Sequence, residues 1–256
     1  MLRRIGLLWF TGNLLMVVGL PVFAAASPIV NGGFEAGNFT GWQAIGDTLV
    51  VDASFGASPT QGSFQALITN MPSFFCGDCV HGTFSGLESV DSSTLATLLG
   101  LPPIGGWPNA FWLLAQDYGG RVEWGSALQQ SFTANAGEVL SFQWNYLTEE
   151  TIPCDYAFIL LDGSLSVLAD YATVSPGSST PFPKESGYHT FSTALTTSGT
   201  HSFAVGVIST VDQIQSSAVL VDGFAVASVP EPATILLLGG GLVGFGGVAW
   251  WRNRRG

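Results

Sequence analysis

The sequence predicts an all-β fold, a jelly-roll-like β-sandwich built as one domain over residues 27–228, and three observations support this prediction. Short apolar runs alternate with turn residues along this region, as expected for strands. Glycine, serine, threonine and aromatic residues are abundant, whereas charged residues make up only 10% of the chain. About nine such runs fit within roughly 200 residues, which is typical of a two-sheet sandwich and long enough to bury one sizeable core.

The clearest predicted strand covers residues 139–147, where apolar and polar side chains alternate strictly. Residues 201–208 repeat the alternation. The apolar face of the first strand is expected in the core and carries Leu140, Phe142, Trp144 and Tyr146. The remaining predicted strands cover residues 47–53, 63–69, 110–115, 127–132, 156–161, 164–170 and 218–227.

One segment departs from the strand pattern and predicts a short helix. Residues 91–100 begin with the capping residues Asp91 and Ser92, carry leucines at helical spacing and end at Gly100. We expect this helix inside a long insertion over residues 76–109. Residues 175–186 are rich in Pro, Ser and Gly and predict a loop.

The N-terminal segment, residues 1–26, has the form of a secretory signal peptide. Arg3 and Arg4 precede an apolar stretch, and small residues at positions 24–26 offer a cleavage site. The segment therefore predicts export through the Sec translocon. An uncleaved anchor helix is the alternative.

The C-terminal segment, residues 229–256, has three parts in a fixed order. Pro230, Glu231 and Pro232 precede an uncharged stretch over residues 235–251, and an arginine-rich tail follows at residues 252–255. As a helix the stretch would reach about 25 Å, at the short end of the range for a bilayer span. The positive-inside rule keeps the arginines cytoplasmic, so we predict a transmembrane helix over residues 235–251.

This three-part order resembles the PEP-CTERM sorting signal of Gram-negative bacteria that carry exopolysaccharide systems. The resemblance implies recognition and cleavage near Pro230-Glu231-Pro232 by an exosortase-type membrane protease. An inner-membrane-anchored precursor would then become a protein of the cell surface or extracellular matrix. In that case the three residues are acted upon and are not catalytic. A simple C-terminal anchor is the alternative.

The charge of the chain changes once the two end segments are set aside. Residues 27–228 retain two of the seven basic residues, Arg121 and Lys184, and 17 of the 18 acids, so their formal charge is about −15. Such a surface repels nucleic acid, which binds clustered Lys and Arg. It suits calcium, cationic partners or neutral glycans, although plain solubility is the simpler explanation.

Two segments at the start and end of the domain predict a calcium site through a second resemblance. Residues 28–42 and 219–224 resemble the first and last strands of carbohydrate-binding-module-like jelly rolls. In that family the two strands are neighbours and often hold a structural calcium. The resemblance therefore implies Glu35 and Asp222 as carboxylate ligands, and oxygen ligands suit calcium. The alternative is a turn at residues 31–33 and a strand-end role for Asp222.

A second group of acids, Glu149, Glu150 and Asp155, lies where a loop should leave the sheet. The surrounding residues 125–158 are similar to a class of exported PEP-CTERM proteins of unassigned activity. The three acids predict a second cation site, with an ordinary acidic loop as the alternative. A glycosidase would need two carboxyl groups about 5–10 Å apart across a sugar site, a distance that sequence does not give.

The remaining candidates are a cysteine pair and a tryptophan. In an exported chain the pair Cys76 and Cys79 favours a local disulfide over a zinc or redox site. A bridge from Cys154 to one of the two is the alternative. Trp107 has a loop-like context and is the best glycan-stacking candidate among the tryptophans, although packing is their commoner role.

These features together predict an exported cell-surface or extracellular-matrix protein without enzymatic activity, associated with exopolysaccharide or biofilm. A calcium-stabilised carbohydrate-binding module is the alternative, and a polysaccharide-active enzyme is the least supported. Structural calcium is the one cofactor expected. The expected partners are an exosortase-type protease, the Sec translocon and exopolysaccharide, and nucleic acid is excluded.

Overall fold

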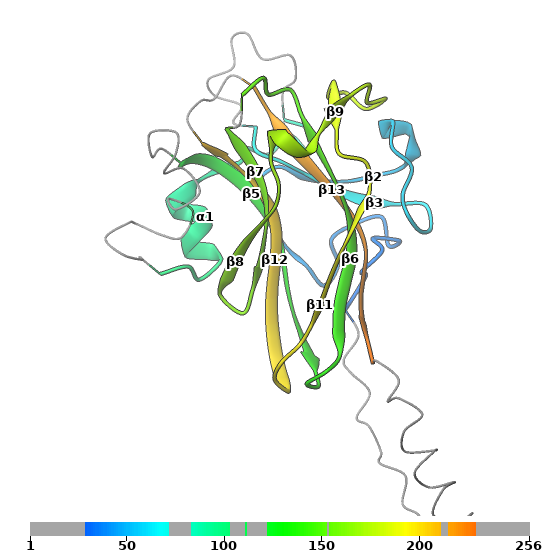
Figure 1. Ribbon diagram of the computed structural model, residues 1–256, viewed down its shortest axis with the longest axis vertical. Helices are drawn as coiled ribbons and strands as arrows, with labels where there is room; N and C mark the ends of the chain where they lie inside the picture. The colour runs from blue at the N-terminus through cyan, green and yellow to red at the C-terminus, as the bar shows by residue number, and fades with distance from the viewer. Residues whose placement is uncertain are drawn as a thin grey trace, which may run out of the picture.

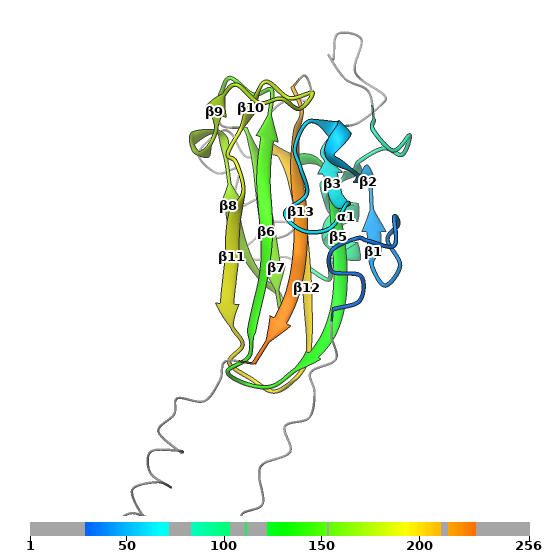
Figure 2. The same ribbon diagram turned by 90° about the vertical axis from the view of Figure 1, so that its right-hand side faces the viewer.

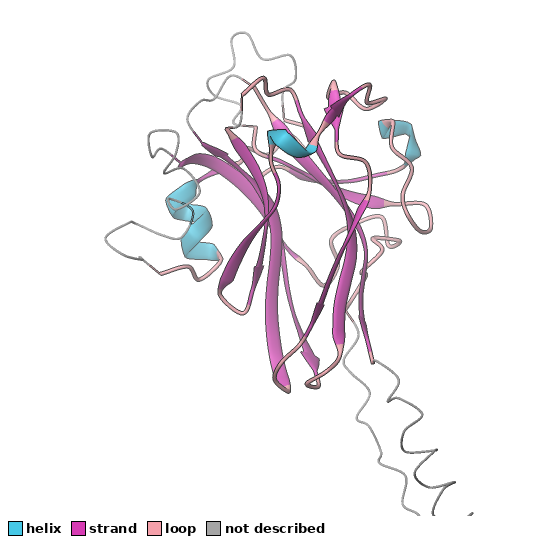
Figure 3. Cartoon of the chain, viewed as in Figure 1, coloured by secondary structure: helices cyan, strands magenta, loops and turns pink. Residues whose placement is uncertain are grey.

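The computed structural model shows an antiparallel sandwich of two β-sheets with one short α-helix (Figures 1 and 3). It describes residues 29–71, 83–102, 111, 122–152, 154–210 and 215–228. We call the two layers sheet 1 and sheet 2. Sheet 1 contains, in spatial order, β1 (Gln43–Ile45), β5 (Val122–Ala134), β12 (Gly199–Thr210), β7 (Asp155–Leu161) and β8 (Ser164–Ala169), with β4 (Val90–Asp91) beside β5.

Sheet 2 is the second layer of the sandwich. Its spatial order is β2 (Thr48–Val51), β3 (Gln65–Thr69), β13 (Ser217–Ala227), β6 (Val139–Thr148), β10 (Lys184–Glu185) and β9 (Ser175–Pro176), with β11 (His189–Ala194) also beside β6.

The strand order is that of a jelly roll. Along the chain, β3, β5, β6 and β7 alternate between the sheets, and β8, β11, β12 and β13 do the same after the β7–β8 hairpin. The result is β3-β13-β6-β11 facing β5-β12-β7-β8, in which most spatial neighbours are distant in sequence. This order confirms the predicted fold class.

The core lies between the sheets, and the face of β6 predicted to be buried is buried. Leu140, Phe142 and Tyr146 are at most 1% exposed, and Trp144 is 8% exposed. The opposing strand β12 contributes Phe203, which is fully buried. Each such large side chain contributes about 1.5–3 kcal/mol relative to exposure, so these two strands are central to stability.

The outer faces of both sheets are covered as well. The helix α1 (Ser92–Leu98) packs on sheet 1 through Leu95 and follows the predicted signals: the Asp91 carboxylate accepts from the Ser93 and Thr94 N–H groups, and Gly100 leaves the helix at a φ of 70°. On sheet 2 the outer layer is formed by the loops before β3 and after β9, whose buried members include Ala57 and Phe182.

Several elements were not predicted, and all of them are short or peripheral. Residues 175–186 contain β9 and β10, so the loop prediction was wrong there, and β1, β4 and β11 carry too few apolar residues to give a pattern. The 3-10 helix η4 (Tyr171–Thr173) precedes β9. The predicted strand at 110–115 lies outside the described residues except for position 111, and the two ends of the insertion, residues 76–82 and 103–109, lie outside them as do both end segments. Among the described residues, no helix is long and apolar enough to cross a membrane.

Candidate functional site

The start of the domain lies against its last strand, as the resemblance implied. The Phe224 N–H donates to the Gly32 carbonyl at 2.9 Å. A Cβ added to Gly32 would lie 2.2 Å from the Phe224 carbonyl oxygen, so only glycine permits this approach. Residues 30–33 form a turn rather than a strand. Of the two predicted calcium ligands, Glu35 lies two residues after this turn, and Asp222 lies in β13, two residues before Phe224.

The Asp222 carboxylate holds the loop before β3. Its Oδ2 accepts from the Thr60 N–H at 2.8 Å, the Thr60 hydroxyl at 2.8 Å and the Gln61 N–H at 3.0 Å, and its Oδ1 accepts from the Gly223 N–H at 2.7 Å. Asp222 is fully buried, and burial raises the pKa of its carboxyl above the usual range although these hydrogen bonds act in the opposite direction.

The Glu35 carboxylate holds the same loop two residues further on. Its oxygens accept from the Ser63 N–H at 3.0 Å and the Phe64 N–H at 2.9 Å. Calcium needs several oxygen atoms that converge on one point. Here N–H donors point at both carboxylates, so this arrangement does not fit a calcium ion held by Glu35 and Asp222. Structural calcium stays a prediction from the resemblance.

The second group of acids lies between the end of β6 and the start of β7. Glu149 is 9% exposed, and Glu150 and Asp155 are fully buried. A Glu149 oxygen accepts from the Ser216 hydroxyl at 3.0 Å, and an Asp155 oxygen accepts from the Asn70 amide at 2.7 Å. Within the described ranges, no three Asp, Glu, His or Cys side chains converge as metal ligands would. The second cation site stays a prediction.

A buried tyrosine and one of the two basic residues of the domain surround these acids. The Tyr146 hydroxyl donates to the Asp155 carbonyl at 3.1 Å. Burial, and next the negative charge of Asp155, raise the pKa of Tyr146 well above its usual value, so the phenol stays neutral. The Lys184 ammonium donates to the Glu150 carbonyl and lies 4.7 Å from the centre of the Tyr171 ring. This network ties β6, β7 and β10 together.

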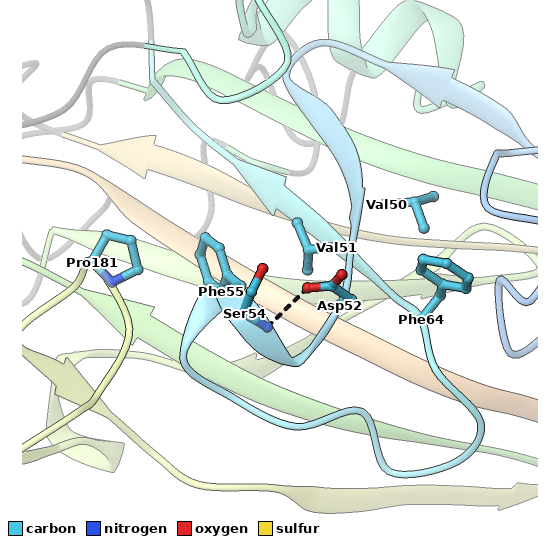
Figure 4. Close-up of a pocket in the computed structure, with 7 residues that line it drawn as sticks. All are labelled: Val50, Val51, Asp52, Ser54, Phe55, Phe64 and Pro181. Carbon is cyan, nitrogen blue, oxygen red and sulfur yellow. Dashed lines mark hydrogen bonds between the residues drawn. The ribbon is translucent and has the colours of Figure 1, made fainter.

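A groove at the edge strand β2 combines aromatic rings with an exposed carboxylate (Figure 4). Its volume is about 450 Å³, within the usual range for small-ligand sites. Its walls come from β2, from the 3-10 helix η1 (Ala53–Phe55), and from the chain just before β3 and β10. The lining residues are Val50, Val51, Asp52, Ser54, Phe55, Phe64 and Pro181.

The groove places aromatic rings beside an ionised carboxylate. Phe55 and Phe64 are partly exposed, and in Figure 4 the Asp52 carboxylate lies between them. One Asp52 oxygen accepts from the Ser54 N–H at 2.8 Å. Hydrogen bonds from the side chain and then the backbone of Ser54 lower the pKa of this carboxyl, so it stays ionised at neutral pH. Ring faces can stack on sugar C–H groups while the carboxylate accepts from sugar hydroxyls. No pattern in the sequence indicates this groove.

The other predicted site residues lie outside the described residues. They are the cysteine pair Cys76 and Cys79, the stacking candidate Trp107, and the processing motif Pro230, Glu231 and Pro232. Cys154 is described and is buried, with its carbonyl accepting from the Thr210 N–H at 2.8 Å.

Comparison with known families decides the nature of the C-terminal segment. The model of the PEP-CTERM protein-sorting motif matches residues 228–255. The chain carries a PEP-CTERM sorting motif. This motif implies processing by an exosortase and marks an exported, membrane-sorted protein of a Gram-negative bacterium. The match begins at the residue after β13, so the sandwich and the sorting motif adjoin directly.

Similar solved structures share little sequence with the sandwich, and no curated protein sequence matches the chain. The K1 cleaved adhesin domain of Lys-gingipain from Porphyromonas gingivalis W83 is 8% identical, with a TM-score of 0.42 over 81% of this chain and 100% of that one. TmCBM61 in complex with beta-1,4-galactotriose is 12% identical, with a TM-score of 0.40 over 78% of this chain and 97% of that one. The CBM22-1 xylan-binding domain from Paenibacillus barcinonensis Xyn10C is 12% identical, with a TM-score of 0.34 over 78% and 94%. At such TM-scores, the sugars named for two of these proteins say nothing about this chain.

Proposed function

We propose that the chain is a cell-surface or extracellular-matrix protein without enzymatic activity that associates with the exopolysaccharide or biofilm of its producing cell. The observation that carries the proposal is the sorting motif placed directly after a folded sandwich, because such a motif exports the domain that precedes it.

Retention of the protein in cells that lack the polysaccharide tests this proposal. We expect the mature protein to remain with the matrix of the producing strain and to appear in the medium of a strain unable to make exopolysaccharide. Equal retention in both strains would contradict the association. Incubation of the purified mature protein with the isolated polysaccharide should release no reducing ends, and release would show that the protein is an enzyme.

The groove at β2 supports a second candidate, a carbohydrate-binding module. Its partly exposed rings and exposed carboxylate suit a neutral, hydroxyl-rich polymer, whereas the acidic domain would repel a polyanion. On this proposal the double variant Phe55→Ala/Asp52→Asn loses retention on the isolated polysaccharide. Leu87→Ala, which removes an apolar side chain that is 62% exposed, is the matched control and should be retained. If Trp107→Ala loses retention and the groove variant does not, the binding surface is the Trp107 loop.

A further inference from the structure

The folded domain ends almost at the sequence that the exosortase must grip. The strand β13 ends at Ala227, and the Pro-Glu-Pro sequence starts at Pro230. A fully extended chain spans at most about 3.6 Å per residue, so Pro230 lies within about 11 Å of the end of β13. A protein that binds Pro230 therefore has to approach the sandwich itself.

The end of the sandwich around Ala227 is formed by two turns. Ala227 and Ala194 both pair with Val139, one on each side of β6, and Gly199 pairs with Ala134. This register places the β5–β6 turn and the β11–β12 turn beside the end of β13, and Figure 2 shows all three at the foot of the sandwich. We call residues 135–138, 195–198 and 227–228 the hairpin end.

The hairpin end is nearly free of charge, although the domain is strongly acidic. Its one charged residue is Glu138, which is 9% exposed and accepts from the Asn135 N–H at 2.6 Å within its own turn. The nearby Asp162 of the β7–β8 turn pairs with His201 at 2.6 Å. The surface itself consists of exposed small or hydroxyl residues: Ala136, Gly137, Thr196, Thr197, Ser198, Ala227 and Ser228. A partner that covers such a surface does not have to remove water from an unpaired charge. The centres of protein interfaces are likewise poor in charged residues.

The last three residues of β13 are held on one side only. The register shifts between Asp222 and Ala225, and beyond this point β13 pairs with β6 but not with β3. Phe224, which is 5% exposed, is the last large residue anchored in the core, and beyond it only Val226 packs against the core. If the segment from Ala225 onward detached from β6, few core contacts would be lost. A protease could therefore bind it in an unfolded form, together with the sorting motif, at a small cost in stability.

We propose that the membrane protease that cuts the sorting motif docks on the hairpin end of the folded domain. This inference rests on the exosortase processing that the motif implies. A lipid surface is the other neighbour to consider, but the hairpin end has no basic residue that would attract anionic head groups. It also carries none of the large exposed apolar side chains of the described residues, such as could enter a bilayer.

Site-specific photo-cross-linking in membranes that contain the full-length chain and the protease tests the contact. A photoreactive residue at Thr196 is expected to give an adduct with the protease. The same residue at Thr97 in α1 is the control, because α1 packs near Gly125, nine residues along β5 from Ala134 and thus roughly 30 Å from the hairpin end. Adducts of Thr196 with lipid alone would overturn the proposal in favour of the bilayer.

Charge substitution gives an independent measurement on the same full-length chain. Ala136→Glu/Thr196→Glu places two unpaired carboxylates on the hairpin end and is expected to slow processing at least tenfold, because each must lose its water in the contact. Ser93→Glu adds an acid to the first turn of α1, where the helix dipole tolerates it, and should leave processing unchanged. If wild type and the double variant are cut equally fast, the contact does not exist. If wild type itself is not cut, the exosortase processing beneath the proposal is wrong, and the two failures are thereby distinguished.

Discussion

Replacement of Asp222 by alanine tests the way in which the two ends of the domain are fastened to the loop before β3. The substitution removes a fully buried carboxylate that accepts four hydrogen bonds, three of them from Thr60 and Gln61. A hydrogen bond to a charged group contributes about 1.5–3 kcal/mol, but both loop residues are exposed, so water can replace part of the loss. We expect a net loss of about 3 kcal/mol, and in a domain of this size that lowers the melting temperature by roughly 6–12 °C.

Calorimetric melting of the mature protein measures this change, and Asp52→Ala is the matched control. Asp52 is also an aspartate whose carboxylate accepts a loop N–H, from Ser54 at 2.8 Å, but it is exposed. Asp52→Ala should therefore lower the melting temperature much less than Asp222→Ala does. Equal shifts in the two variants would refute the reasoning that burial of the carboxylate makes it an anchor.

The same measurement separates hydrogen bonding from calcium. Because N–H and O–H donors occupy the Asp222 oxygens, we expect an excess of chelator to leave the melting temperature of the wild type unchanged. A fall in the wild type that is absent in Asp222→Ala would instead show that calcium binds at this carboxylate, as the resemblance of the sequence implied.

Two further predictions concern the core and the pH dependence of stability. Gly206→Ala places a Cβ 2.3 Å from the Ser126 carbonyl oxygen in the middle of sheet 1, so soluble folded protein should be lost or its melting temperature fall by at least 6 °C, which circular dichroism detects. Because burial raises the pKa of Asp222 above its usual 3.8, the folded protein binds that proton more tightly than the unfolded chain does. Wild type should therefore gain stability relative to Asp222→Asn as the pH falls through the raised pKa, and the gain should be complete below about pH 3.8. The melting temperatures of the two proteins at pH 7 and pH 4 measure this. A wild type that loses stability relative to Asp222→Asn between pH 7 and pH 4 would contradict the prediction.

The sequence predicted the central strands because their burial leaves a local record. In β6 every second residue from Leu140 to Tyr146 faces the core, which is the period that a buried strand face requires. The edge strand β11 has no such record, since Phe191 is its one large apolar side chain and even that is only partly buried. Edge strands bury one face incompletely, so their composition approaches that of a loop.

The candidate sites depend on contacts that a sequence pattern does not encode. The resemblance predicted that Glu35 and Asp222 act at one place in the fold, and in the structure both carboxylates hold the loop at residues 60–64. Apart from the Thr60 hydroxyl, the partners of these carboxylates are backbone N–H groups, which every residue type except proline supplies, so the loop sequence gives little signal of the contact. The groove combines Asp52 and Phe55 with Pro181, which is more than 120 residues away, and it has no local signature at all.

The acidic composition of the domain is in part structural, and this changes how its charge bears on function. Asp47 illustrates the point: its buried carboxylate accepts from the Phe84 N–H at 3.0 Å and the Ser85 N–H at 2.8 Å and so holds the chain before α1. With only two basic residues in the domain, backbone N–H groups take the place of Lys and Arg as partners of such acids. The buried acids of the described residues are Asp47, Glu138, Glu149, Glu150, Asp155 and Asp222. The negative surface is therefore weaker and less uniform than a formal charge of about −15 suggests, and the nearly uncharged hairpin end beside the sorting motif is where a membrane protease can approach an otherwise acidic domain.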